Sequence, residues 1–181
     1  MSRMIILDRD GVINQDSDAY IKNADEWIPV PGSLEAIRRL KKAGYLVTVA
    51  SNQSGIARGL YSEDDLKQID DKMRQMLAAQ GTSIDDIFYC RHGPESNCRC
   101  RKPEPGLLID IAQKYNIDLS VTPFVGDSIV DIRAAEKANA VPVLVRTGKG
   151  EQVIQKCPEA SNLSVYDDLA HFVRETLHGG A

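Results

Sequence analysis

The sequence predicts an α/β fold, a three-layer α/β/α sandwich in which helices cover both faces of a mostly parallel sheet. Two observations predict this fold. Short apolar runs alternate along the chain with longer segments whose apolar residues recur every three or four positions. No repeat or low-complexity linker interrupts the 181 residues, a length that fits one domain. Strands that alternate with helices favour a parallel sheet joined by crossover helices.

Five apolar runs are expected to form strands, because each is short and ends at polar or turn-forming residues. Strands of a parallel sheet are buried on both faces, and they therefore read as nearly continuous apolar runs. In chain order the expected strands are residues 4–7, 45–51, 87–90, 122–127 and 141–146.

Five segments with helical periodicity lie between and after these strands. The first is opened by Pro31-Gly32-Ser33 and stopped by Gly44, and the second begins at Ser62, which with Asp65 three residues later resembles an N-terminal cap. Residues 11–33 are too many for a plain loop between a strand and a helix, so we expect an ordered flap there. The other three helices are expected over residues 106–115, 129–139 and 166–177.

Composition and charge argue against two kinds of partner. The net charge of −4 gives the chain no overall electrostatic reason to bind nucleic acid or an anionic membrane. No apolar run approaches the roughly 20 residues of a membrane-spanning helix, and MSRMIILDRDG lacks the long apolar stretch of a signal peptide. We therefore expect a cytoplasmic protein with reduced thiols. No segment for oligomerisation is evident, so a monomer is expected.

Acidic residues follow two of the predicted strands, and in a parallel sheet ligands bind beyond those strand ends. Asp8 and Asp10 come directly after the first strand, and Asp127 follows a later strand after a glycine. Carboxylates this close repel one another unless a cation or a proton relieves the repulsion. By themselves, Asp8 and Asp10 could be turn formers that end a strand. Three acidic groups at one sheet edge instead predict a Mg²⁺ site.

Two other strand ends offer groups that bind phosphate. Ser51 and Asn52 follow a Val-rich strand, where a hydroxyl and backbone N–H groups can donate to phosphate oxygens. Taken alone, such a Ser-Asn pair is more often a helix cap. Lys102, held before a proline, can neutralise a phosphoryl group in transfer, although a lysine on an exposed loop is usually just solvated.

Three of the four cysteines gather with a histidine in one short segment. Cys90, His92, Cys98 and Cys100 form the pattern C-x-H-x₅-C-x-C. Three thiolates and an imidazole match a closed tetrahedral zinc site, which is structural because it leaves no position for an activated water. Disulfide pairing is the alternative, and the reducing cytoplasm argues against it. Zinc would fix the backbone just before the Arg-Lys-Pro that follows.

Four motifs in order, ILDRDGV, VASNQSG, CRKPEPG and VGDSIVD, resemble those of the haloacid dehalogenase superfamily of phosphatases. The resemblance spans residues 4–150. It implies a Rossmann-like fold without a large cap domain, a single domain over residues 1–181 and a zinc-binding loop at 90–100. The chain has Val12 and Ser51 where the superfamily often has threonine, and both residues still allow the implied roles.

The resemblance also implies a mechanism. Asp8 would attack phosphorus and form an aspartyl-phosphate, while Asp10 would protonate the leaving oxygen and then deprotonate the hydrolytic water. Mg²⁺ would be held by Asp8, the carbonyl of Asp10 and Asp127. Ser51 and Lys102 would hold the phosphoryl oxygens.

The segments NQSGIARG and VLVRTGKG favour one substrate within the superfamily, D-glycero-D-manno-heptose 1,7-bisphosphate. The implied activity is removal of its 7-phosphate, in the supply of heptose for lipopolysaccharide or another surface glycan. The resemblance implies that the phosphorylated sugar is contacted by Asp16, Tyr20, Ser51, Asn52, Gln53, Ser54, Arg101 and Lys102.

Two other functions remain open from the sequence. A histidinol-phosphate phosphatase carries a similar zinc loop, and a zinc-stabilised module that binds nucleic acid or protein belongs to another class altogether. Two residues also keep open roles. Asp131 either supports the site or is a solvated acid at a helix start, and Cys157 is expected to be a free thiol.

Overall fold

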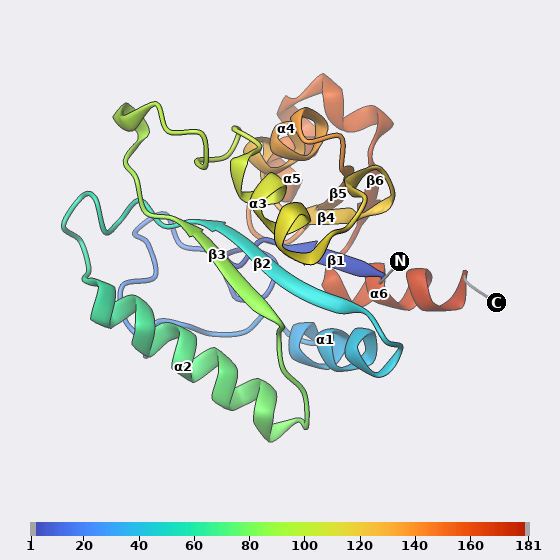
Figure 1. The fold of residues 1–181 in the computed structure, drawn as a ribbon, viewed down its shortest axis with the longest axis horizontal. Helices are drawn as coiled ribbons and strands as arrows, with labels where there is room; N and C mark the ends of the chain where they lie inside the picture. Colours follow the sequence, from blue (N-terminus) through green and yellow to red (C-terminus); the bar gives the residue numbers. More distant parts are fainter. Residues whose placement is uncertain (1–2, 180–181) are drawn as a thin grey trace.

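A six-stranded parallel sheet lies between two layers of helices in the computed structural model, which describes residues 3–179 (Figure 1). The strand order is β3-β2-β1-β4-β5-β6, and every neighbouring pair runs parallel. The predicted three-layer α/β/α sandwich is therefore confirmed. Residues 1–2 and 180–181, the ends of the single domain expected over 1–181, lie outside the described residues.

The strands and helices have the following bounds. The strands are β1 (Met4–Leu7), β2 (Leu46–Asn52), β3 (Asp86–Cys90), β4 (Pro123–Gly126), β5 (Val141–Val145) and β6 (Ser164–Tyr166). The helices are α1 (Ser33–Lys42), α2 (Glu63–Ala79), α3 (Gly106–Tyr115), α4 (Ile129–Lys137), α5 (Gly150–Lys156) and α6 (Leu169–His178). Within the described part of the chain, no helix is both long and apolar enough to cross a membrane.

Strand β1 is central and feeds both apolar cores. Because side chains of a strand alternate between faces, Ile5 and Leu7 pack with α1, α2 and α6, whereas Met4 and Ile6 pack with α3 and α4. All four residues of β1 are buried. Figure 1 shows the two helical layers on opposite sides of the sheet.

Local signals place the helices. At the start of α2, Ser62 accepts a hydrogen bond from the N–H of Asp65, and the Asp65 side chain accepts one from the N–H of Ser62. This capping box satisfies two backbone donors that a helix start otherwise leaves unpaired. Gly44 lies just beyond α1 with a φ of 82°, a left-handed conformation that glycine adopts without strain. Both predicted signals are confirmed.

The C-terminal end differs from the prediction. The helix expected from residue 166 begins at Leu169, because the side chain of Asp168 caps it by accepting the N–H of His171 at 2.7 Å. Residues 164–166 instead form β6, an edge strand of three residues that is too short to show a period. The helix expected over 129–139 ends at Lys137, and α5 was not predicted.

The predicted flap over residues 11–33 is anchored to the body of the domain. The hydroxyl of Ser33 donates to the carbonyl of Ile13 at 2.7 Å, and Lys72 of α2 donates to the carbonyl of Ala24 at 2.6 Å. Trp27 is fully buried in the core beneath the flap. These contacts hold the segment across the carboxyl edge of the sheet.

The strand register brings the predicted site residues to one edge. Leu7 of β1 pairs with Val49 of β2 and with Val125 of β4. The residues that follow these positions, Asp8 and Asp127 among them, therefore lie beside one another beyond the strand ends. Parallel sheets bind ligands at this edge.

The two methionines of α2 offer a test of this packing. Met73 is fully buried in the core and Met76 is only partly buried at its margin. We expect Met73→Ala to lower the free energy of unfolding by about 2–5 kcal/mol, since removal of a large buried side chain leaves a cavity. In urea denaturation, the matched variant Met76→Ala should lose clearly less free energy of unfolding than Met73→Ala. Equal losses in the two variants would contradict this packing.

Candidate active site

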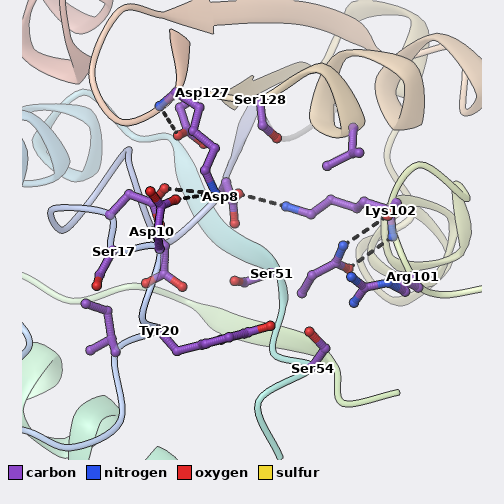
Figure 2. A pocket seen from close by; sticks show the side chains of 16 residues that line it. Asp8, Asp10, Ser17, Tyr20, Ser51, Ser54, Arg101, Lys102, Asp127 and Ser128 are labelled. Atoms are coloured by element: carbon purple, nitrogen blue, oxygen red, sulfur yellow. Dashed lines mark hydrogen bonds and ion pairs between the residues drawn. The ribbon is translucent and has the colours of Figure 1, made fainter. Parts of the chain in front are cut away.

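A cavity of about 260 Å³ opens at the carboxyl edge of the sheet (Figure 2). Its walls come from the end of β1, the flap, the end of β2, the segment before α3, and the turn after β4. Most of the site residues predicted from the sequence line this cavity: Asp8, Asp10, Asp16, Tyr20, Ser51, Asn52, Ser54, Arg101, Lys102 and Asp127. The predicted Gln53 does not line it.

Asp8 lies directly beyond β1, and its N–H donates to the carbonyl of Val125 at 2.8 Å. One oxygen accepts the N–H of Arg9 at 2.7 Å, and the other lies 2.9 Å from the ammonium of Lys102. The pKa of Asp8 is raised to about 7: burial is the largest cause, Lys102 opposes it, and the neighbouring carboxylates Asp131 and Asp10 add to it. An anionic Asp8 therefore needs positive charge beside it.

Three carboxylates meet at this point. Ligand oxygens of Asp8, Asp127 and Asp131 all lie within 4.8 Å of one another. Burial, and then the charges of Asp131 and Asp8, hold the pKa of Asp127 well above its usual range. A cluster of buried carboxylate oxygens is the donor set of a hard cation, and a divalent ion would remove the repulsion among them. The residues present therefore fit Mg²⁺.

Glycines make room for these carboxylates, and sequence reasoning noted Gly126 but missed Gly11 and Gly148. A Cβ at Gly11 would lie 2.2 Å from Asp127 Oδ2, and a Cβ at Gly148 would lie 2.0 Å from the same oxygen. At Gly126 a Cβ would meet the Cβ of Asp131 at 2.3 Å. Gly11 and Gly148 also have φ values of 83° and 57°. Glycine is therefore required for both shape and backbone conformation at these two positions.

Lys102 is buried, and its ammonium joins the carboxylate cluster. It lies 2.9 Å from Asp8 and 2.6 Å from Asp131, and it donates to the carbonyl of Ala50 at 2.9 Å. Burial alone would lower the pKa of Lys102, but Asp131 and Asp8 raise it above its ordinary value. The lysine is therefore a fixed cation.

Asn52 holds the backbone of Lys102. Its side-chain N–H₂ donates to the carbonyl of Lys102 at 3.0 Å, and its side-chain oxygen accepts the N–H of Lys102 at 3.0 Å. The amide of Asn52 is thus engaged in placing the lysine. Its predicted contact with the substrate stays a prediction.

Asp131 has partners on both oxygens. Oδ1 lies 2.6 Å from Lys102, while Oδ2 accepts hydrogen bonds from the N–H and the hydroxyl of Ser128 at the start of α4. The side chain is fully buried. Of the two roles that the sequence left open, the structure excludes a solvated acid.

Asp10 occupies a separate electrostatic setting. Arg9, fully buried, donates to both of its oxygens at 3.0 and 3.2 Å, and Asn14 and Gln53 donate at 2.9 and 3.0 Å. Burial alone would raise the pKa of Asp10, but the charge of Arg9 and these hydrogen bonds lower it. Two carboxylates that are two residues apart thus have opposite pKa shifts. Sequence reasoning missed Arg9, although its position between two acids is a usable signal.

Gln53 organises the floor beneath the cavity. Its side-chain N–H₂ donates to both Asp10 and the hydroxyl of Ser51 at 3.0 Å, and its carbonyl accepts the hydroxyl of Tyr61 at 2.5 Å. The side chain of Gln53 is buried. The structure therefore places Gln53 behind Asp10 and Ser51, which themselves line the cavity.

The flap supplies the opposite wall. Tyr20 lines the cavity with a φ of 67°, an uncommon left-handed conformation for a residue with a side chain, and the guanidinium of Arg58 lies 5.9 Å from the centre of its ring. Asp16 lies 3.1 Å from the ammonium of Lys149. Figure 2 shows Tyr20 and Ser54 on the side of the cavity that faces away from Asp127.

The four predicted zinc ligands converge in the segment after β3. The sulfur of Cys100 lies 3.2 Å from that of Cys90 and 3.5 Å from that of Cys98, and 3.3 Å from Nδ1 of His92. These spacings exceed a disulfide bond of about 2.05 Å, and all four cysteines are free. They are close to the edges, roughly 3.7 Å, of a tetrahedron with Zn–S bonds of about 2.3 Å.

The thiols of this loop shift one another's pKa. The pKa of Cys100 is raised to about 12 by burial and by hydrogen bonds with Cys90 and Cys98, whereas burial at Cys98 is outweighed by hydrogen bonds, which lower its pKa to about 6. Three thiols and an imidazole nitrogen are a donor set that zinc binds as thiolates and neutral imidazole, so the residues present fit zinc. Arg101 donates to the carbonyl of His92 at 3.4 Å, which links this loop to the cavity.

Comparison with known proteins places the chain in a family. The model of the haloacid dehalogenase-like hydrolase family matches residues 3–139. Proteins from Pseudomonas aeruginosa and Pseudomonas putida, both called D-glycero-beta-D-manno-heptose-1,7-bisphosphate 7-phosphatase, are 53% identical over 171 residues and 51% identical over 175. These alignments cover 94% and 97% of this chain and 96% and 99% of those proteins.

A crystal structure agrees with these sequence matches. D,D-heptose 1,7-bisphosphate phosphatase from Bordetella bronchiseptica, in complex with magnesium and phosphate, superposes with a TM-score of 0.96 at 48% identity. The superposition covers 98% of this chain and 99% of that one. Since the family model and these relatives cover most or nearly all of the sequence, the chain belongs to the haloacid dehalogenase-like hydrolase family.

Proposed function

We propose that the protein is a magnesium-dependent phosphatase that removes the 7-phosphate of D-glycero-β-D-manno-heptose 1,7-bisphosphate. One observation carries the chemistry: the buried carboxylate of Asp8 lies beyond the central strand, 2.9 Å from Lys102 and within 4.8 Å of Asp127. The names of the relatives support the substrate. Membership of a hydrolase family favours an enzyme over a zinc-stabilised binding module.

In the proposed first step, a lone pair on one carboxylate oxygen of Asp8 attacks the phosphorus of the 7-phosphate. A P–O bond forms to the carboxylate as the bond to the sugar oxygen breaks, which gives an aspartyl-phosphate. The ammonium of Lys102 and the hydroxyl of Ser51 hold the phosphoryl oxygens in place. Positioning and charge stabilisation supply most of the rate in phosphoryl transfer.

Asp8, Asp127 and the carbonyl of Asp10 are proposed to hold Mg²⁺, which supplies the positive charge that an anionic nucleophile needs beside an anionic phosphate. Asp131 lies within reach of the same ion, but Lys102 and Ser128 already occupy its two oxygens. We therefore propose that Asp131 orients the ammonium of Lys102.

Asp10 is proposed to act on protons in both steps. It protonates the leaving sugar oxygen, and it then takes a proton from the water that hydrolyses the aspartyl-phosphate. Its lowered pKa in the free protein suits the second role, because a base must begin as a carboxylate. For the first role Asp10 has to gain its proton with the substrate bound.

The remaining predicted residues are proposed to bind the sugar and its second phosphate. Asp16 and Tyr20 of the flap, Ser54 after β2 and Arg101 after the zinc loop all line the cavity. Arg101 offers a planar fork of donors suited to phosphate. Gln53 is proposed to act on the substrate indirectly, because its side chain donates hydrogen bonds to Asp10 and Ser51.

Several wider predictions belong to the same proposal. We propose a single domain over residues 1–181 that works as a cytoplasmic monomer, with no nucleic-acid or membrane partner. Its product would serve the supply of heptose for lipopolysaccharide or another surface glycan. Zinc bound by Cys90, His92, Cys98 and Cys100 is proposed to be structural.

A substrate assay tests the proposed function. Phosphate release should be fastest from the β anomer of heptose 1,7-bisphosphate, and omission of Mg²⁺ should reduce it to background. The α anomer and histidinol phosphate should react roughly 10–200-fold more slowly, the range that differences in substrate fit usually produce. Faster release from histidinol phosphate would contradict the proposed substrate, and full activity without Mg²⁺ would contradict the proposed cofactor.

Removal of one zinc ligand tests the metal loop. Cys98→Ala should lose bound zinc, measured by mass spectrometry of the metal content, and most of its turnover, while circular dichroism shows a folded sheet. The reason is that the loop no longer fixes the backbone of Arg101 and Lys102. Cys157→Ala, at a cysteine far along the chain, is the control and should keep both its bound zinc and its turnover. A zinc-free Cys98→Ala with normal kinetics would refute this role.

A further inference from the structure

Lys149, in the loop between β5 and α5, contacts two parts of the site that lie far apart in the sequence. Its backbone N–H donates to Asp127 Oδ2 at 2.8 Å. Its ammonium lies 3.1 Å from Asp16 and 4.0 Å from Asp18 of the flap. The main chain of this one residue thus touches the carboxylate cluster, while its side chain touches the flap.

The loop that carries Lys149 is packed tightly against Gly11 and Asp127. The hydroxyl of Thr147 donates to the carbonyl of Gly11 at 2.6 Å. A Cβ at Gly148 would lie 2.0 Å from Asp127 Oδ2 and 2.8 Å from the Cα of Gly11. The ammonium of Lys149 therefore extends from a backbone that has no room to shift toward the site.

The ion pair stands between two cavities. Lys149, Asp16 and Asp18 line the active-site cavity and also a neighbouring cavity of about 400 Å³, whose other walls include Gln15 and Pro31. Residues that line both spaces form the partition between them. The position of Asp16 therefore decides where the active-site cavity ends on this side.

Asp16 needs a cation to stay in this wall. Its side chain is 19% exposed and belongs to a site that already holds the carboxylates of Asp8 and Asp127. Like charges repel, so an unpaired Asp16 would favour positions nearer to solvent. Lys149 is 47% exposed, so screening by water keeps the energy of the pair modest. The pair is suited to set the position of a wall rather than to stabilise the fold.

We propose that Lys149 is a positioning residue: it fixes Asp16 of the flap in the cavity wall and so sets the affinity for the sugar portion of the substrate. This inference rests on the proposed function and adds a residue that the four sequence motifs do not contain. The ammonium acts through Asp16, and the phosphoryl group is left to Lys102 and Ser51.

Three variants test the inference. Lys149→Met removes the ammonium but keeps the backbone N–H that holds Asp127, and Lys149→Arg keeps the positive charge. Lys156→Met removes an exposed lysine at the end of α5 and is the control. For Lys149→Met we expect KM for heptose bisphosphate to rise roughly tenfold, or 1.4 kcal/mol, with kcat reduced less than twofold. Lys149→Arg should restore most of the affinity, and Lys156→Met should match the native enzyme.

A double-mutant cycle tests whether Lys149 acts through Asp16. If it does, Lys149→Met should add little to the KM of Asp16→Asn, because the partner is already gone. Additive effects would overturn the inference. So would an equal loss of kcat on heptose bisphosphate and on p-nitrophenyl phosphate, which has no sugar, because Lys149 would then act at the phosphoryl group.

Hydrogen exchange of the free protein separates this inference from the proposed function. Amides of residues 15–21 should exchange faster in Lys149→Met than in the native protein or in Lys156→Met, since the flap loses its anchor. Equal exchange rates would overturn the inference. Failure of the native protein to hydrolyse heptose bisphosphate would reject the proposed substrate, and the exchange rates would still decide whether Lys149 fixes the flap.

Discussion

The site depends on how buried negative charge is held in place. Asp8, Asp127 and Asp131 bring their oxygens within 4.8 Å of one another, and Lys102 contacts two of them. Charges removed from water are costly unless they are paired. The cluster therefore retains a surplus of acid that a divalent cation can balance. In the proposed mechanism the same surplus makes the arrival of an anionic phosphate dependent on that cation.

The fold provides this arrangement through its central strand and through small residues. β1 is buried on both faces, so its end is fixed by two apolar cores at once. Gly11 and Gly148 then let two loops approach Asp127 more closely than any side chain would allow. Asn52 fixes the backbone of Lys102 with two hydrogen bonds. Each device limits movement of a charge whose position decides the chemistry.

The sequence predicted the layers of the fold and most of the residues around the cavity, because buried parallel strands and strand-end motifs leave strong local patterns. It missed what tertiary contacts decide. β6 is too short to show a period, and the buried Arg9 reads as a surface charge until its partner Asp10 is placed. Gln53 belongs to the second motif yet does not line the cavity. The segment VLVRTGKG contains Lys149, but the contact of Lys149 with the flap emerges only when the flap meets the β5–α5 loop.

Chemical trapping of the phosphoryl group is the most direct test of the central claim, that Asp8 becomes covalently phosphorylated. The enzyme would be mixed with heptose bisphosphate and Mg²⁺, quenched in acid within one turnover and reduced with borohydride, which converts an aspartyl-phosphate to homoserine. Mass spectrometry of the peptide that contains Asp8 should show homoserine at position 8, and Asp8→Asn should show none. Steady turnover by the native enzyme with Asp8 unmodified, or homoserine at position 10 in place of Asp10, would contradict the account.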